Sequence, residues 1–123
     1  MEIRLESGQS KIPITLCDNE LTRAIYEMLP FEASVNTWGK EIYFPMPIKA
    51  SFSQEKLTQE VKIGDVCVWP QGPCVCIFFG PTPMSTSSEP RPYSDVVIVG
   101  KVKGNSQSLE DINPHQKVTL VKL

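Results

Sequence analysis

Alternation of apolar and polar side chains is the most frequent pattern in this chain, and it predicts β-strands. In residues 2–6, Ile3 and Leu5 alternate with charged residues, and residues 11–17 repeat the alternation after a short polar turn. Successive side chains of a strand point to opposite faces, so each segment has one face for a core and one for solvent. Together the two segments predict a β-hairpin at the start of the chain.

One segment has helical periodicity instead. Its apolar residues recur at intervals of three and four positions, at Leu21, Ala24, Ile25 and Met28. Asp18 or Asn19 is suited to cap the start of this helix, and Pro30 ends it. We expect the helix to cover an open end or face of a sheet.

Further strand-like segments follow, separated by glycine and proline. The most apolar are residues 66–69 and 74–79, which predict a buried hairpin, and residues 95–102, which predict an interior strand. The remaining predicted elements are strands at 31–38, 40–44 and 117–122, and short helical turns at 53–57 and 109–112. Many short strands with one main helix predict a mainly β protein, a closed or nearly closed antiparallel β-barrel that forms a single domain over residues 1–123.

Charge and composition narrow the classes of partner. The net charge is -2 and the basic residues do not cluster, which argues against nucleic acid, because a phosphate backbone needs a Lys/Arg patch. The alternating start is unlike a secretory signal peptide, and no apolar run approaches the ~20 residues of a membrane helix. We therefore expect a cytoplasmic protein without membrane association. The four cysteines do not suggest a disulfide scaffold.

Several runs resemble those of a known family. They are residues 38–44 (Trp-Gly-Lys-Glu-Ile-Tyr-Phe), 69–70 (Trp-Pro), 76–83 (Cys-Ile-Phe-Phe-Gly-Pro-Thr-Pro) and 89–92 (Glu-Pro-Arg-Pro). With their spacing, they resemble a prokaryotic cyclophilin-like family of uncharacterised proteins across nearly the whole chain. The resemblance implies a cyclophilin-type antiparallel β-barrel with few helices. It implies no established activity, because this family is related to the prolyl isomerases by structure only.

The residues with which true cyclophilins hold a substrate proline have no match in this sequence. The run Phe-x-x-Gln-Gly-Gly is missing, and the single histidine, His115, lies in a predicted turn near the end. A peptidyl-prolyl cis-trans isomerase-like enzyme with an atypical site is therefore the alternative function. In it, Arg91 would donate toward the proline nitrogen in the twisted transition state. The sequence leaves open whether the chain is an enzyme.

The proline-rich loop at residues 80–92 supplies three of the candidate ligand-binding residues. Glu89 and Arg91 each precede a proline, and at this spacing in an extended segment both side chains project to the same side. The guanidinium could clamp an anion or a carbonyl group, and a surface ion pair of small energetic value is the alternative interpretation. Thr82 could donate to a ligand or simply close a turn.

The neighbouring strands supply the other three candidates. If Ile42 and Phe44 face the core, Glu41 and Tyr43 face a groove, and Trp38, Trp69 and Phe78 can form its apolar wall. We expect a small molecule or an extended, proline-containing peptide to bind in this cleft, with no cofactor. The candidate ligand-binding residues are Glu41, Tyr43, Phe78, Thr82, Glu89 and Arg91.

The cysteines of the central hairpin are expected to share one face. With a turn centred on Gln71 and Gly72, Cys67 faces Cys76, and Trp69 faces Cys74. We expect Cys67 and Cys76 to be reduced and buried, since free cysteine is among the most buried residue types. Zinc held by the three thiols and His115 is the alternative, although Cys-x-Cys on a strand is not the usual zinc knuckle.

Overall fold

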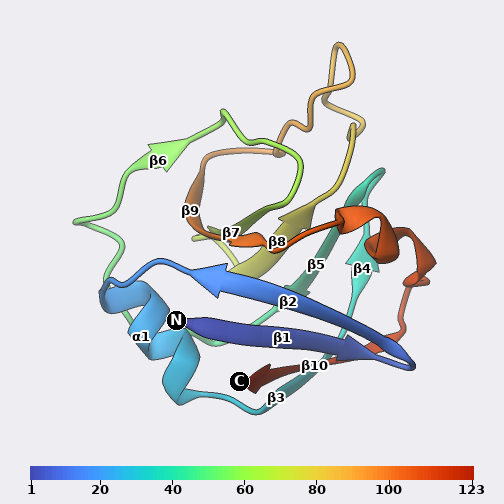
Figure 1. Ribbon diagram of the computed structural model, residues 1–123. Helices are drawn as coiled ribbons and strands as arrows, with labels where there is room; N and C mark the ends of the chain where they lie inside the picture. Colours follow the sequence, from blue (N-terminus) through green and yellow to red (C-terminus); the bar gives the residue numbers. More distant parts are fainter.

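The strands pair into one antiparallel sheet that rolls into a nearly closed barrel, as Figure 1 shows for the computed structural model, which describes residues 1–123. This confirms the mainly β barrel with one main helix. The elements are β1 (Glu2–Ser7), β2 (Ser10–Leu16), α1 (Glu20–Glu27), β3 (Phe31–Ser34), β4 (Asn36–Thr37), β5 (Glu41–Pro45), β6 (Leu57–Thr58), β7 (Asp65–Trp69), β8 (Cys74–Phe78), β9 (Val96–Val102), a 3₁₀ helix η1 (Ser106–Asp111) and β10 (Lys117–Lys122).

The barrel closes because the two ends of the sheet are consecutive in the chain. The strand order is β3-β10-β1-β2-β9-β7-β8-β5-β4, and only Val35 separates β3 from β4. The Val35 N–H donates to the carbonyl of Gln116 (3.0 Å), and the His115 N–H donates to the carbonyl of Val35 (2.8 Å). The single strand predicted at residues 31–38 is therefore divided, since its first half pairs with β10 and its second half with β5.

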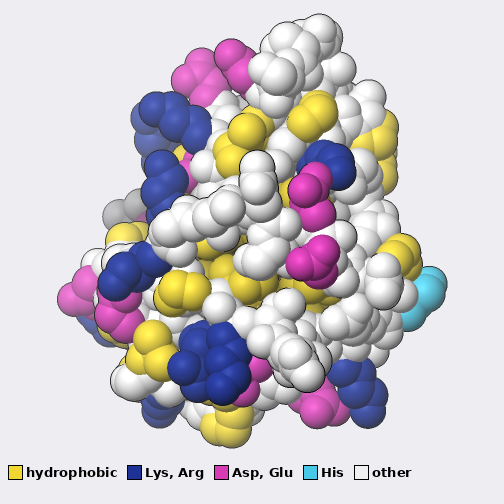
Figure 2. Space-filling view, turned by 45° about the vertical axis from the view of Figure 1, so that its right-hand side comes forward, with side chains coloured by type: hydrophobic (Ala, Val, Ile, Leu, Met, Phe, Trp, Pro, Cys, Tyr) yellow, Lys and Arg dark blue, Asp and Glu magenta, His cyan; other side chains and the backbone are white.

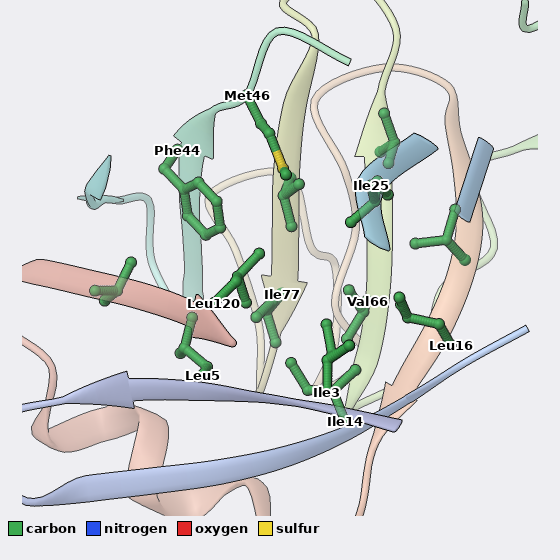
Figure 3. Close-up of a cluster of buried hydrophobic side chains, with 14 of the residues drawn as sticks. Ile3, Leu5, Ile14, Leu16, Ile25, Phe44, Met46, Val66, Ile77 and Leu120 are labelled. Carbon is green, nitrogen blue, oxygen red and sulfur yellow. The ribbon is translucent and has the colours of Figure 1, made fainter. Parts of the chain in front are cut away.

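Inward-facing side chains of the strands form one core inside the barrel. Figure 3 shows these side chains pointing toward one another from β1, β2, β5, β7, β8 and β10. Helix α1 adds Leu21 and Ile25 to this core, as its apolar stripe predicted. Its start is held by a capping box, in which the Asn19 side chain accepts from the Thr22 N–H (2.8 Å) and the Thr22 hydroxyl accepts from the Asn19 N–H (2.9 Å).

No helix of the structure has both the length and the apolar character that crossing a membrane requires. On the face of the molecule drawn in Figure 2, positively and negatively charged side chains are interspersed.

One of the two short helical turns was predicted wrongly. Residues 109–112 largely fall within η1, but residues 53–56 form no helix, and Leu57 is already the first residue of β6. The backbone of β6 pairs with β9, Leu57 opposite Val97, and the Leu57 side chain is 47% exposed. An exposed leucine gives a helical turn no apolar surface to bury, whereas the pairing satisfies the backbone of both strands.

Strands β7 and β8 are buried on both faces, and their outer face forms the base of the candidate site. Their inward side chains join the core, while the outward ones form a second cluster with Val61 and Val96. The outward members of this cluster on the two strands are Cys67, Cys74, Cys76 and Phe78. The loop between β8 and β9, which projects beyond the barrel in Figure 1, supplies part of the cover for this outer face.

Candidate functional site

A small pocket lies against the outer face of β5, β7 and β8. Its cavity volume is about 170 Å³, and eight of its ten lining residues are hydrophobic. Both tryptophans of the chain are among them. The lining residues are Trp38, Glu41, Tyr43, Trp69, Cys74, Cys76, Phe78, Pro92, Tyr93 and Val96.

The alternation of side chains along β5 determines which of its residues form the floor of this pocket. On β5, Ile42 and Phe44 are fully buried in the barrel core, so Glu41 and Tyr43 face the other way. Strand β8 lies beside β5, with Glu41 opposite Phe78. On the far side of β8, Cys67 pairs with Cys76 and Trp69 with Cys74, which confirms the predicted register of the central hairpin.

Tyr93 and Pro92 reach the pocket from the end of the loop between β8 and β9. The Tyr93 ring lies edge to face with Trp38 (6.1 Å between centroids) and with Trp69 (6.4 Å). The Trp69 indole N–H donates to the hydroxyl of Ser94, which ties this end of the loop to β7. Because Tyr93 is 68% exposed, it forms the rim of the pocket and not its floor.

Thr82 holds the two ends of the same loop together. Its hydroxyl donates to the carbonyl of Arg91, and its backbone N–H donates to the Ser85 hydroxyl (2.9 Å). The turn before β5 supports this arrangement, since the Lys40 N–H donates to the carbonyl of Pro81 (2.9 Å). Gly39 has φ +61°, and a Cβ there would meet the Thr82 Cα at 2.9 Å. Thr82 is thus a positioning residue, buried outside the pocket lining.

Glu41 is the one carboxylic acid that lines the pocket, and it is only 6% exposed. Its Oε1 atom is buried without a hydrogen-bond partner. Burial raises the pKa of Glu41 to about 7, and a hydrogen bond from the Cys76 thiol lowers it by a smaller amount. No lysine, arginine or histidine lines the pocket. The site therefore combines aromatic walls with a carboxyl group that has no counter-charge from the chain.

Comparison with known proteins places this barrel in a family. The family model described as Cyclophilin-like matches residues 1–121. The chain belongs to the Cyclophilin-like family. Its fold is similar to the solution structure of the hypothetical protein AF2241 from Archaeoglobus fulgidus, with a TM-score of 0.85 and 29% identity over 100% of this chain and 95% of that chain. No curated protein matches the sequence.

Two of the four cysteines of this Cyclophilin-like protein, Cys74 and Cys76, line the pocket. All four are free thiols, and Cys67, Cys74 and Cys76 are buried. Burial raises the pKa of each of these three thiols, most strongly for Cys67 and Cys76, so they stay protonated. The zinc alternative finds no support, because His115 is exposed before β10 and no group of three His, Cys, Asp or Glu side chains is placed to hold a metal.

Glu89 and Arg91 lie outside the aromatic pocket of this Cyclophilin-like protein. They line a separate, open, polar groove that shares no lining residue with the pocket. The reason is local: Pro92 is buried and lines the pocket, and the neighbouring Arg91 side chain is exposed on the other side. The single cleft expected from the sequence is thus two sites, and only Glu41, Tyr43 and Phe78 of the six candidates share the pocket.

Sequence reasoning missed Tyr93 and Pro92 as pocket residues. Trp38 and Trp69 were expected as apolar walls, and both line the pocket. One feature of the sequence could have indicated Tyr93: it is an aromatic residue directly after the proline-rich loop. Its contact with Trp38 joins segments more than fifty positions apart in sequence, so no local pattern indicates it.

Proposed function

We propose that this Cyclophilin-like protein is a binding module for a small organic molecule with an apolar body and one hydrogen-bonding end. The observation that carries the proposal is the unpartnered Oε1 atom of Glu41 at the wall of an aromatic pocket. A buried polar atom without a partner costs about 1–3 kcal/mol. A ligand that donates a hydrogen bond to this oxygen recovers that cost and covers the apolar wall at the same time.

The volume of the pocket favours a small molecule over an extended peptide. Pockets for drug-sized ligands enclose roughly 300–1,000 Å³. The pocket here has about 170 Å³, which suits a fragment of one ring or a short branched chain. Five aromatic residues line this small volume. Aromatic rings bury a large apolar area against a ligand and lose little side-chain conformational entropy when they do so.

The loop above the pocket supports binding because its shape is held before a ligand arrives. Thr82 closes its base, and Ser94 attaches its end to Trp69. Prolines at positions 81, 83, 90 and 92 reduce the number of conformations that the free loop can adopt. A rim that is already ordered loses little conformational entropy on binding.

The isomerase alternative requires a guanidinium inside a desolvated pocket. Arg91 is exposed and lines the separate groove, so no arginine lies against the aromatic walls. We therefore expect proline-peptide isomerisation at the uncatalysed rate, unchanged by Arg91→Ala. Catalysis that disappears in the Arg91→Ala variant would restore the alternative function.

Intrinsic fluorescence tests the binding proposal directly, because both tryptophans line the pocket. We expect a screen of one-ring amines, amides and alcohols to contain compounds that change the emission saturably. Tyr93→Ala should weaken their binding severalfold, while Arg91→Ala, a matched change in an exposed residue outside the pocket, should leave it unchanged. Failure of every compound to saturate, or equal loss in both variants, would contradict the proposal.

A further inference from the structure

We infer that the ligand of the aromatic pocket is a small organic cation, an alkyl- or cycloalkylammonium whose N–H group faces Glu41 and whose charge lies against the aromatic rings. This inference rests on the proposed function and names the chemical class that the site would take. It draws on the charge balance of the pocket, on its aromatic walls and on the unpartnered carboxyl oxygen.

The pocket contains an acid and no base. The cation nearest in sequence, Lys40, is directed elsewhere, with its Nζ 2.6 Å from Oε1 of Glu110. Lys101 is placed beside Asp65, with 3.9 Å between Nζ and Oδ1. Buried carboxylates in proteins are normally paired with a positive charge. Since the chain supplies none here, a ligand that brings one completes the site.

The groups that face Glu41 from the packed strands are neutral. Cys76 and Cys74 of β8 and Cys67 of β7 are protonated thiols, because burial and the charge of Glu41 both raise their pKa values. The other ionisable side chains of the pocket are the phenols of Tyr43 and Tyr93. The Cys76 thiol donates a hydrogen bond to the carboxylate, but none of these groups brings a positive charge that would compete with a bound ammonium.

The aromatic walls favour the same charge. Trp38, Tyr43, Trp69, Phe78 and Tyr93 all line the pocket, and the negative face of an aromatic ring attracts a cation. An anionic ligand would meet both these rings and the carboxylate unfavourably. A neutral ligand would gain the apolar contact and a hydrogen bond to Glu41, but no attraction between opposite charges. Protonation of Glu41 would remove its charge, but it would leave Oε1 without a partner from the chain.

Three compounds of one shape separate these cases: cyclohexylammonium, cyclohexanol and cyclohexanecarboxylate. In tryptophan fluorescence titrations near pH 8, we expect cyclohexylammonium to bind at least about tenfold more tightly than cyclohexanol. Both compounds can donate a hydrogen bond to the Glu41 carboxylate, but only the ammonium adds an attraction between opposite charges. Cyclohexanecarboxylate should not bind. Cyclohexanol has the same ring and also donates a hydrogen bond, so the difference reports the charge.

The pH dependence provides an independent readout. With a pKa of about 7, Glu41 is about 0.9 ionised at pH 8 and about 0.03 ionised at pH 5.5. The affinity for cyclohexylammonium should fall by about tenfold or more over this range, while the amine itself stays charged and cyclohexanol binding stays nearly constant. Glu41→Gln should bind the amine and the alcohol equally at both pH values. Tyr93→Leu should weaken the amine severalfold more than the alcohol.

Three outcomes overturn the inference. If cyclohexanol binds as tightly as cyclohexylammonium near pH 8, or if Glu41→Gln keeps the preference for the amine, the ligand is not selected by charge, and the proposed small-molecule function stands without it. If none of the three compounds binds, the cation inference fails. The proposed function fails with it only if the wider screen of amines, amides and alcohols also yields no saturable ligand.

Discussion

Replacing Glu41 with glutamine removes a buried ionisable group and keeps its shape. The carboxyl pKa is raised from its ordinary value of 4.5 to about 7 in the folded chain, chiefly by burial. The folded state therefore holds the proton more tightly than the unfolded state does. At about 1.4 kcal/mol for each unit of pKa, this difference corresponds to about 3 kcal/mol of folding free energy.

The sign of the effect follows from the direction of the shift. Below about pH 4.5, Glu41 is protonated in both states and carries no penalty. As the pH rises to about 7, the unfolded chain ionises first, so the free energy of unfolding falls by about 3 kcal/mol and stays lower at higher pH. Glu41→Gln has no ionisable group at this position, so its free energy of unfolding should not show this decrease.

Urea denaturation of both proteins at steps between about pH 4 and pH 8 measures the effect, since the midpoint and slope give the free energy of unfolding at each step. Glu2, whose pKa is lowered by its hydrogen bonds to Lys103 and Thr15, changes stability in the opposite direction, but it is present in both proteins and cancels in the difference. Glu89→Gln, a change of an exposed residue, controls for the amide and should stay within about 0.5 kcal/mol of the parent. A pH-independent difference between the parent and Glu41→Gln would refute the reasoning.

Three further predictions concern the loop and the thiols. Thr82→Val removes the hydroxyl that donates to the Arg91 carbonyl, so it should lower the free energy of unfolding in urea by about 1 kcal/mol and weaken ligand binding. Thr82→Ser keeps the hydroxyl and should retain the stability and the affinity of the parent. Equal behaviour of the two variants would contradict the role of this hydrogen bond. Gly39→Ala should destabilise the chain by more than about 1 kcal/mol, because the φ angle of residue 39 is +61° and the new Cβ would meet Thr82. A change in melting temperature of less than about 2 °C would argue against this contact. In the native state, a thiol reagent should rapidly modify only the exposed Cys17, and after unfolding it should modify all four cysteines. Rapid labelling of a second thiol in the native state would contradict the burial of the other three cysteines.

Much of the barrel could be predicted because its signals are local. The alternation in β1 and β2, the cap at Asn19 and the tight turn between β7 and β8 each depend on neighbouring residues, and all appear as expected. The same two-residue period placed Glu41 and Tyr43 on the outer face of β5. The division at Val35 was missed because it depends on which strands the two halves pair with.

The class of fold, the hairpin register and the side of β5 that carries the candidate acid could all be predicted, since they follow from the alternation of side chains and from turn chemistry. In contrast, the burial of Glu41, the place of Tyr93 at the rim of its pocket and the position of Arg91 in a different groove became visible only in the folded chain. These outcomes depend on the path of a loop whose ends are joined by Thr82. Burial and charge balance are set by residues distant in the chain, and a carboxyl group has no raised pKa until they surround it.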